Sequence, residues 1–132
     1  MLSVREAQKH MASNGASIVI YTSTAGQSGG GGGASAYSVS KAGQIMFMKC
    51  MARELAPHNI RVNCIAPAWT DTEMAHASLE RIGRDNVAKS FPLGRIGQVQ
   101  DISDATLFLL SDLSAFITGS TVTVDGGIAM RG

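Results

Sequence analysis

Apolar and polar positions along the chain fall into two kinds of segment. Short runs rich in β-branched residues are typical of buried strands, and they lie at 17–23, 61–66 and 121–124. Longer segments with apolar residues at helical spacing predict helices over 2–12, from Ser35 as N-cap to about Ala56, and over 100–111. Because strands alternate with helices, the pattern predicts an α/β fold with a parallel sheet.

Two intervals depart from this alternation. Residues 26–34 are rich in glycine and predict a loop, whereas residues 71–90 predict short helical pieces. Neither a repeat nor a linker divides the sequence, so we expect one domain over residues 1–132.

The segment 36–56 is apolar on more than one side of the predicted helix. Its apolar residues are Val39, Ala42, Ile45, Met46, Phe47, Met48, Cys50, Met51 and Leu55. A helix packed on one side only shows a single apolar stripe. The segment is therefore either buried within its own domain or packed on a sheet with one face and on a partner helix with another. The pattern leaves both interpretations open, and the second would make the chain a homo-oligomer through this segment.

Composition narrows the classes of function. The chain is 45% hydrophobic and 16% charged with a net charge of +1, which favours a globular cytoplasmic protein and gives no electrostatic case for nucleic acid. The N-terminal residues lack the long apolar core of a signal peptide or membrane span. Cys50 and Cys64 fall within a helical and a strand pattern, so we expect two buried free thiols and no metal site.

Tyr37 and Lys41 are the first candidates for chemistry. They are separated by one helical turn at the start of a predicted helix, so that both can reach one ligand. A nearby ammonium favours the phenolate, and Lys41 is therefore expected to lower the pKa of Tyr37 from its ordinary value of about 10. The alternative is an exposed tyrosine and an exposed lysine without a shared role.

Ser23 is the third candidate. It lies at the C-terminal end of the predicted strand 17–23, and ligands of open parallel sheets bind beyond the carboxyl ends of strands. Its hydroxyl could hold a carbonyl oxygen to which Tyr37 delivers a proton. A serine at this position can equally cap the backbone of the following loop.

With these residues the chain resembles the short-chain dehydrogenase/reductase family. Ser23 followed by the pattern Tyr37-x-x-x-Lys41 matches the arrangement of the family's catalytic residues. Further segments are similar to family motifs in the family's order, at 61–67, 91–95 and 119–127. The resemblance covers nearly all of the chain. Because the family uses the helix corresponding to 36–56 in a dimer interface, the resemblance also favours a homo-oligomer through this segment. It implies the C-terminal part of a Rossmann-like, doubly wound parallel sheet, with about three strands and flanking helices.

The resemblance also implies a nicotinamide cofactor, NAD or NADP. The residues expected to contact this cofactor are Tyr37, Lys41, Pro67, Ala68, Thr70 and Thr72. Ala68 differs by one methyl group from the glycine that usually follows the proline in the family. The choice between NAD and NADP stays open, because the residue that reads the ribose 2′ position belongs to the N-terminal half of family members.

The implied activity is hydride transfer between the nicotinamide and a small carbonyl or alcohol substrate. Ser23 would polarise the carbonyl oxygen and Tyr37 would transfer the proton. Lys41 would lower the pKa of Tyr37 and bind the nicotinamide ribose. Residues 73–92 resemble the family's variable lid. Its apolar residues are Met74, Ala75, Leu79, Ile82 and Phe91. They either line an apolar substrate region or pack the lid on the sheet.

One family feature has no counterpart in the sequence. Family members begin with a strand, a glycine-rich turn and a helix that receives the pyrophosphate. The only glycine run, 29–33, lies between Ser23 and Tyr37, and we interpret it as a connector. We therefore expect the C-terminal half of a dehydrogenase, whose edge strand 17–23 is covered by another segment, chain or copy. The alternatives are a structural partner subunit without its own nucleotide site and a non-catalytic truncated fragment.

Overall fold

The structure is a computed structural model that describes residues 2–11 and 15–130. Helices and strands alternate along most of the chain, as the sequence predicts. In chain order the elements are α1 (Leu2–Gln8), β1 (Ala16–Tyr21), α2 (Ala25–Ser28), α3 (Ser35–Leu55), η1 (Ala56–His58), β2 (Ile60–Pro67), α4 (Glu73–Ile82), α5 (Arg84–Lys89), α6 (Val99–Leu110), η2 (Asp112–Ser114) and β3 (Thr121–Val124).

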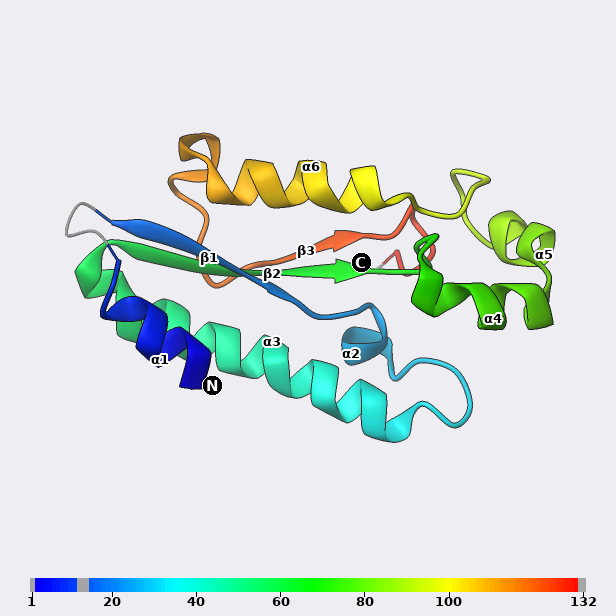
Figure 1. The fold of residues 1–132 in the computed structure, drawn as a ribbon, viewed down its shortest axis with the longest axis horizontal. Helices are drawn as coiled ribbons and strands as arrows, with labels where there is room; N and C mark the ends of the chain where they lie inside the picture. The colour runs from blue at the N-terminus through cyan, green and yellow to red at the C-terminus, as the bar shows by residue number, and fades with distance from the viewer. Residues whose placement is uncertain (1, 12–14, 131–132) are drawn as a thin grey trace.

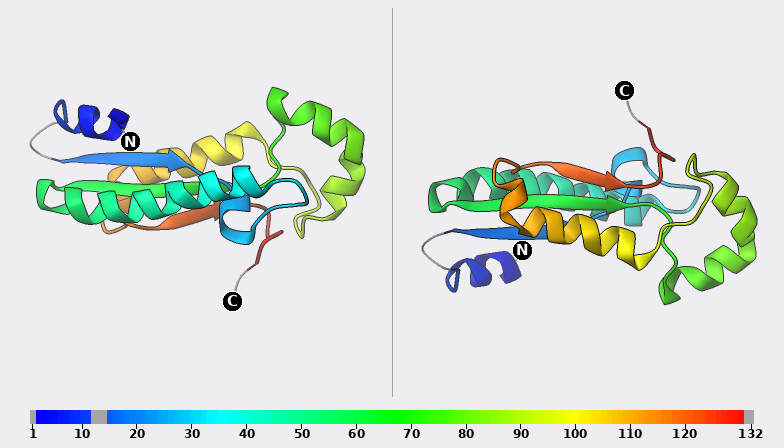
Figure 2. Two further views of the ribbon diagram at one scale, coloured as in Figure 1. Left: turned by 90° about the horizontal axis from the view of Figure 1, so that it is seen from below. Right: turned by 90° about the horizontal axis from the view of Figure 1, so that it is seen from above.

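The three strands form one parallel sheet in the order β1-β2-β3. Helix α3 covers one face of this sheet and α6 covers the other, so the molecule has three layers (Figures 1 and 2). This architecture confirms the predicted α/β fold with a parallel sheet. Helices α4 and α5 lie beyond the carboxyl ends of the strands, where sequence reasoning places the candidate site (Figure 1).

The main hydrophobic core lies where α3 meets the sheet. Its buried members are Met48, Met51, Ala52, Leu55, Ile60, Val62 and Cys64. Residues 62–66 of β2 are fully buried, because this central strand is covered by helices on both faces. Fully burying a side chain as large as Met48 stabilises the fold by roughly 1.5–3 kcal/mol. The core therefore fixes the helix that carries Tyr37 and Lys41.

Asn63 is a polar residue in the middle of the buried strand β2, and both ends of its amide have a hydrogen-bond partner. Its Nδ2 donates to the Ile117 carbonyl at 2.9 Å, and its Oδ1 accepts from the Ser120 backbone N at 3.1 Å. A buried amide with partners at both ends costs little, whereas an unpaired one is expensive. Asn63 thus ties β2 to the segment that leads into β3.

The region of α4 and α5 has a second, smaller apolar cluster. Its buried members are Leu79, Val87, Phe91 and Ile96. Leu79 and Phe91 therefore pack the predicted lid, whereas Met74 is 93% exposed.

Several predicted boundaries shift in the structure. Strand β1 ends at Tyr21, so Ser23 follows the strand instead of belonging to it. The expected loop contains the short helix α2, and Ala34, not Ser35, is the N-cap of α3. Helix α1 ends at Gln8, and the predicted stop signal at Asn14 lies outside the described residues.

Strand β1 lies at the edge of the sheet, as expected. Along a parallel strand, every second residue directs its backbone N–H and C=O groups to the same neighbouring strand. The backbone N–H groups of Ala16 and Thr22 point to the β2 side. The backbone groups of Ser17 and Val19 therefore face the other edge, next to which α1 lies (Figure 2). That another segment, chain or copy covers this edge of the sheet stays a prediction. None of the helices in the described part of the chain is both long and apolar enough to cross a bilayer.

Candidate active site

Tyr37 and Lys41 lie together in the first two turns of α3. The Lys41 ammonium nitrogen is 5.6 Å from the centroid of the Tyr37 ring, which is within the range of a cation–π contact. Tyr37 is 50% exposed, so its phenol is open to a ligand. The helical spacing thus brings the two side chains to one place, as predicted.

The C-terminal end of β1 lies next to Lys41. Lys41 Nζ donates to the Tyr21 carbonyl at 3.2 Å, and Tyr21 precedes Ser23 by two residues. Because an extended chain rises about 3.3 Å per residue, Ser23 follows within about 7 Å along the backbone. The three predicted catalytic residues therefore gather beyond the carboxyl end of β1.

Ser23 retains a free donor in this arrangement. Its Oγ accepts a hydrogen bond from the Ala25 backbone N at 3.2 Å, so the hydroxyl does cap the following turn. A hydroxyl that accepts through its oxygen still has its own proton to donate. Capping and polarisation of a substrate carbonyl are therefore compatible roles for Ser23.

The residues expected to contact the nicotinamide lie at the end of the neighbouring strand β2. The Pro67 carbonyl accepts from the Thr24 backbone N at 3.0 Å, which joins this strand end to the residue after Ser23. Thr70 forms a bridge with Gly97, and its Oγ1 donates to the Ala68 carbonyl at 3.1 Å. Thr72 is the N-cap residue of α4, yet its side chain makes no capping hydrogen bond, so its hydroxyl is available.

A cavity of about 410 Å³ opens beside Ser23. It is lined by Thr24, Ser28, Ala68, Trp69, Ile128, Ala129 and Met130. These residues come from the segment after β1, the loop after β2 and the C-terminal turn, which lie close together in Figures 1 and 2. Most of the lining is apolar, and the two hydroxyls lie on the side of Ser23. The C-terminal turn gave no signal in the sequence pattern and was not among the predicted site residues.

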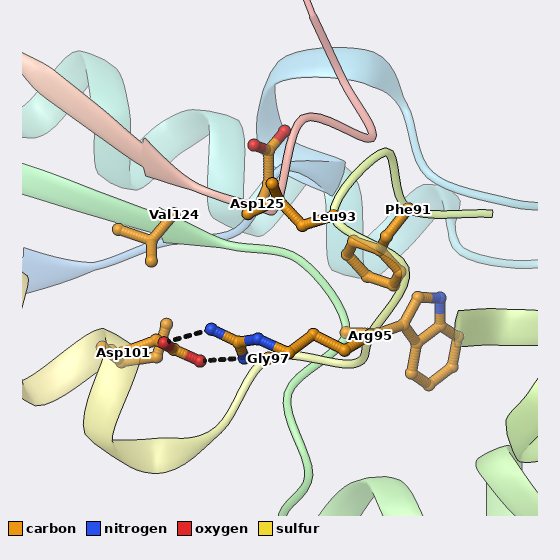
Figure 3. Close-up of a pocket in the computed structure, with 10 residues that line it drawn as sticks. Phe91, Leu93, Arg95, Gly97, Asp101, Val124 and Asp125 are labelled. Atoms are coloured by element: carbon orange, nitrogen blue, oxygen red, sulfur yellow. Dashed lines mark hydrogen bonds and ion pairs between the residues drawn. The ribbon is translucent and has the colours of Figure 1, made fainter. Parts of the chain in front are cut away.

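A second cavity, of about 100 Å³, lies between the base of the lid and α6 (Figure 3). Its lining includes Arg95 and Asp101, which form two parallel hydrogen bonds of 2.7 Å each. The Arg95 guanidinium and the Gln98 backbone N hold the pKa of the Asp101 carboxyl well below its ordinary range. Ser23, Tyr37 and Lys41 do not line this cavity, so we assign its ion pair to anchoring the lid.

A charged cluster joins the lid to the loop after β2. The Asp71 carboxylate accepts from Arg84 and lies 3.2 Å from Nε2 of His76. The Arg84 hydrogen bond is the main cause that lowers the pKa of Asp71 from its ordinary value. His76 is exposed, and its contact with Asp71 was not predicted because residues 71, 76 and 84 share no single helical face.

The two cysteines differ from expectation in one respect. Cys64 is buried, and burial raises the pKa of its thiol to about 11. Cys50, in contrast, is exposed, so the prediction of two buried thiols is wrong for this residue. It lies on the apolar side of α3 that faces away from the core, and periodicity cannot distinguish two apolar faces. Among the described residues, no three potential metal-ligating side chains cluster.

The fold and this arrangement of side chains define a class of protein. Residues 1–129 match a family model described as enoyl-(acyl carrier protein) reductase. The chain belongs to the short-chain dehydrogenase/reductase family, and its sheet is the corresponding part of a Rossmann-like fold.

Three relatives show how far the likeness extends. The chain is 41% identical over 118 residues to an uncharacterized short-chain type dehydrogenase/reductase of Sinorhizobium fredii, covering 89% of this chain and 47% of the relative. It is 42% identical over 113 residues to the 3-oxoacyl-acyl-carrier-protein reductase FabG of Escherichia coli, covering 86% and 46%. A short-chain dehydrogenase/reductase structure from Brucella melitensis superposes with a TM-score of 0.82 at 33% identity, covering 87% and 46%. The chain thus spans about half the length of the curated relatives it matches.

The site residues fit one end of a nicotinamide dinucleotide. An ammonium has three N–H donors, and one of those on Lys41 goes to Tyr21, which leaves two for ribose hydroxyls. The phenol of Tyr37 and the hydroxyl of Thr72 add further polar groups. Within residues 15–130, none of the three strands leads into a glycine-rich turn and a helix of the kind that holds a pyrophosphate.

Proposed function

We propose that this chain supplies the catalytic half of a reductase that uses NAD or NADP to interconvert a carbonyl compound and an alcohol. The observation that carries the proposal is the position of the Lys41 ammonium, 5.6 Å from the Tyr37 ring and 3.2 Å from the Tyr21 carbonyl, beside Ser23. Membership of the short-chain dehydrogenase/reductase family supports it.

The three side chains have separate roles in the proposed reaction. The Ser23 hydroxyl donates to the carbonyl oxygen of the substrate, and Tyr37 transfers its phenolic proton to that oxygen. The Lys41 ammonium stabilises the phenolate that remains. Lys41, Thr70 and Thr72 would hold the nicotinamide end of the cofactor, which when bound in its reduced form would supply the hydride to the carbonyl carbon. Pro67 and Ala68 form the turn beside it.

We further propose a substrate with an apolar chain. The cavity of about 410 Å³ beside Ser23 has an apolar lining that includes Trp69 and Ile128. Reductases of 3-oxoacyl-acyl-carrier-protein, named for substrates of this kind, are among the relatives. Residues 73–92 are proposed as the lid over this region, within a single partial domain.

The assembly proposed for the chain is a homo-oligomer through α3. Val39 and Met46 of this helix are 71% and 59% exposed, although the opposite side of α3 is buried in the core. A second apolar face of this kind favours packing against another copy. A cytoplasmic location is proposed on composition alone.

The test is reduction of a 3-oxoacyl thioester with NADPH or NADH. Turnover is measured for this chain mixed with a separately produced N-terminal half of the Escherichia coli relative. We expect Tyr37→Phe to lower turnover by about 10²–10⁴-fold, the usual contribution of a positioned acid or base, without loss of the fold. Tyr21→Phe is the matched control, since it alters the other tyrosine of the chain. Unchanged turnover in Tyr37→Phe would contradict the assignment.

A further inference from the structure

Thr22 connects the end of β1 directly to the catalytic helix. It is a buried residue, 4% exposed, and its Oγ1 donates to the Lys41 carbonyl at 2.8 Å. Lys41 lies within α3, where each carbonyl already accepts from the N–H four residues later. A carbonyl oxygen has two lone pairs, and the Thr22 hydroxyl uses the second one.

The neighbouring residue holds the other end of the same lysine. The Tyr21 carbonyl accepts from Lys41 Nζ at 3.2 Å. Two successive residues therefore hold Lys41, Tyr21 through the ammonium and Thr22 through the backbone carbonyl. The Thr22 backbone N in turn donates to the Ile65 carbonyl of β2 at 2.8 Å. The position of Lys41 is thereby fixed relative to the sheet and not only to its own helix.

Helix α2 closes this arrangement from a third side. A Cβ atom built on Gly26 would lie 2.7 Å from the Lys41 carbonyl carbon and 2.9 Å from the Ala42 nitrogen. Side chains cannot approach backbone atoms so closely, and only glycine lets α2 pack on α3 here. One turn earlier, Ser38 Oγ donates to the Gly29 carbonyl at 2.7 Å. The first turns of α3 are therefore held at two points on the same side.

We propose that Thr22 is a positioning residue of the active site, which sets the place of Lys41 and Tyr37 relative to Ser23. It precedes Ser23 in the chain and bonds to Lys41, so it links the residue that polarises the substrate to the helix that transfers the proton. Catalytic groups lose efficiency when they are displaced by as little as 1 Å, and a buried bond at this point limits such displacement. The catalytic meaning of this role rests on the proposed function, whereas the bond to Lys41 can be tested without it.

The experiment treats the folded chain with acetic anhydride. The acylation rate of each lysine is then measured by mass spectrometry. The chain has four lysines, so Lys9, Lys49 and Lys89 serve as internal controls. Thr22→Val removes the hydroxyl with little change of shape, and Thr22→Ser keeps it. We expect Thr22→Val to accelerate acylation of Lys41 about fivefold, the factor that one net hydrogen bond represents, and to leave the other three lysines unchanged. Thr22→Ser should return Lys41 to the parent rate.

Three results would overturn the proposal. Lys41 could react in Thr22→Val as it does in the parent, or all four lysines could accelerate together, or Thr22→Ser could fail to restore the parent rate. If Thr22→Val does not fold, the parent still tests whether β1 and its extension hold Lys41. The Lys41 amine, which donates to the Tyr21 carbonyl, must then react more slowly than that of exposed Lys49, and equal rates would contradict the arrangement on which the proposal depends. Acylation requires neither cofactor nor turnover. Failure of the reductase assay would therefore disprove the proposed function without affecting this result.

Discussion

The helix that carries Tyr37 and Lys41 and the segment proposed as the lid are held by different kinds of contact. Helix α3 is fixed by the main apolar core and by hydrogen bonds between uncharged groups, such as that from Thr22 to the Lys41 carbonyl. The proposed lid, residues 73–92, has its own small apolar cluster. Its Arg84 pairs with Asp71 of the loop after β2, and Arg95, just after the lid, pairs with Asp101 of α6. Two of the proposed catalytic groups, Tyr37 and Lys41, thus lie on a helix that packs in the main core, whereas the proposed lid packs around a cluster of its own.

This difference predicts that the two apolar clusters respond separately to truncation. Met48 and Leu79 are both fully buried, the first in the main core and the second in the lid. Replacing either by alanine should cost about 2–5 kcal/mol in its own unit, because a cavity remains. Met48→Ala should lower the free energy of unfolding of the whole chain in urea. Leu79→Ala should instead speed hydrogen exchange within residues 73–89 and leave the strands protected, and equal exchange throughout the chain would show one cooperative unit.

Two glycine substitutions test how tightly α2 packs on α3. Gly26→Ala would force a Cβ to within 2.7 Å of Lys41, and overpacking of this kind costs typically about 1–3 kcal/mol. Gly43 lies on α3, and a Cβ added there would meet no described atom within 4 Å beyond its own helix's nearby backbone, so Gly43→Ala should stabilise by about 0.5–1 kcal/mol. Urea unfolding of the two variants should show shifts of opposite sign. Equal shifts would mean that α2 does not pack tightly on α3.

The charged groups of the lid predict the smallest effect, a pH dependence confined to one region. Arg84 lowers the pKa of Asp71 in the folded state, whereas the unfolded value is about 3.9. The pair therefore stabilises the lid above about pH 4, and this contribution is lost as the pH falls through the lowered pKa. Asp101, whose pKa Arg95 lowers, acts in the same direction at the base of the lid.

Hydrogen exchange of residues 73–89 as a function of pH measures this effect. Asp71→Asn should remove most of the acid-dependent loss of protection in the lid. Asp85→Asn, which changes an exposed carboxylate of α5, should leave that loss unchanged. The lid would not depend on the Asp71–Arg84 pair if both variants behaved like the parent.

Local sequence patterns pick out the candidate catalytic side chains, but they do not show the contacts that hold these side chains in place. Ser23, Tyr37 and Lys41 were found from a strand end and a helical spacing, which are local patterns. Thr22 and Gly26 were not found, because their importance depends on α2 and β1 meeting α3 in three dimensions.

Two further elements show where local patterns fail. Helix α2 has only four residues, which are too few to show a helical period. The sequence therefore predicts a loop where most of this helix lies. Strand β3, by contrast, has the predicted bounds 121–124, since a β-branched run between a glycine and a polar turn is a clear local pattern.

The most direct test of the central claim uses reduced nicotinamide mononucleotide, which lacks the adenine half of the dinucleotide. Titration of the isotope-labelled chain, followed by chemical-shift changes in its amide spectrum, reports where this ligand binds. The account predicts shifts at Tyr37, Lys41 and Thr70 that saturate in the parent and are lost in Lys41→Met. Shifts confined to other residues, or unchanged in Lys41→Met, would contradict a nicotinamide site at the start of α3.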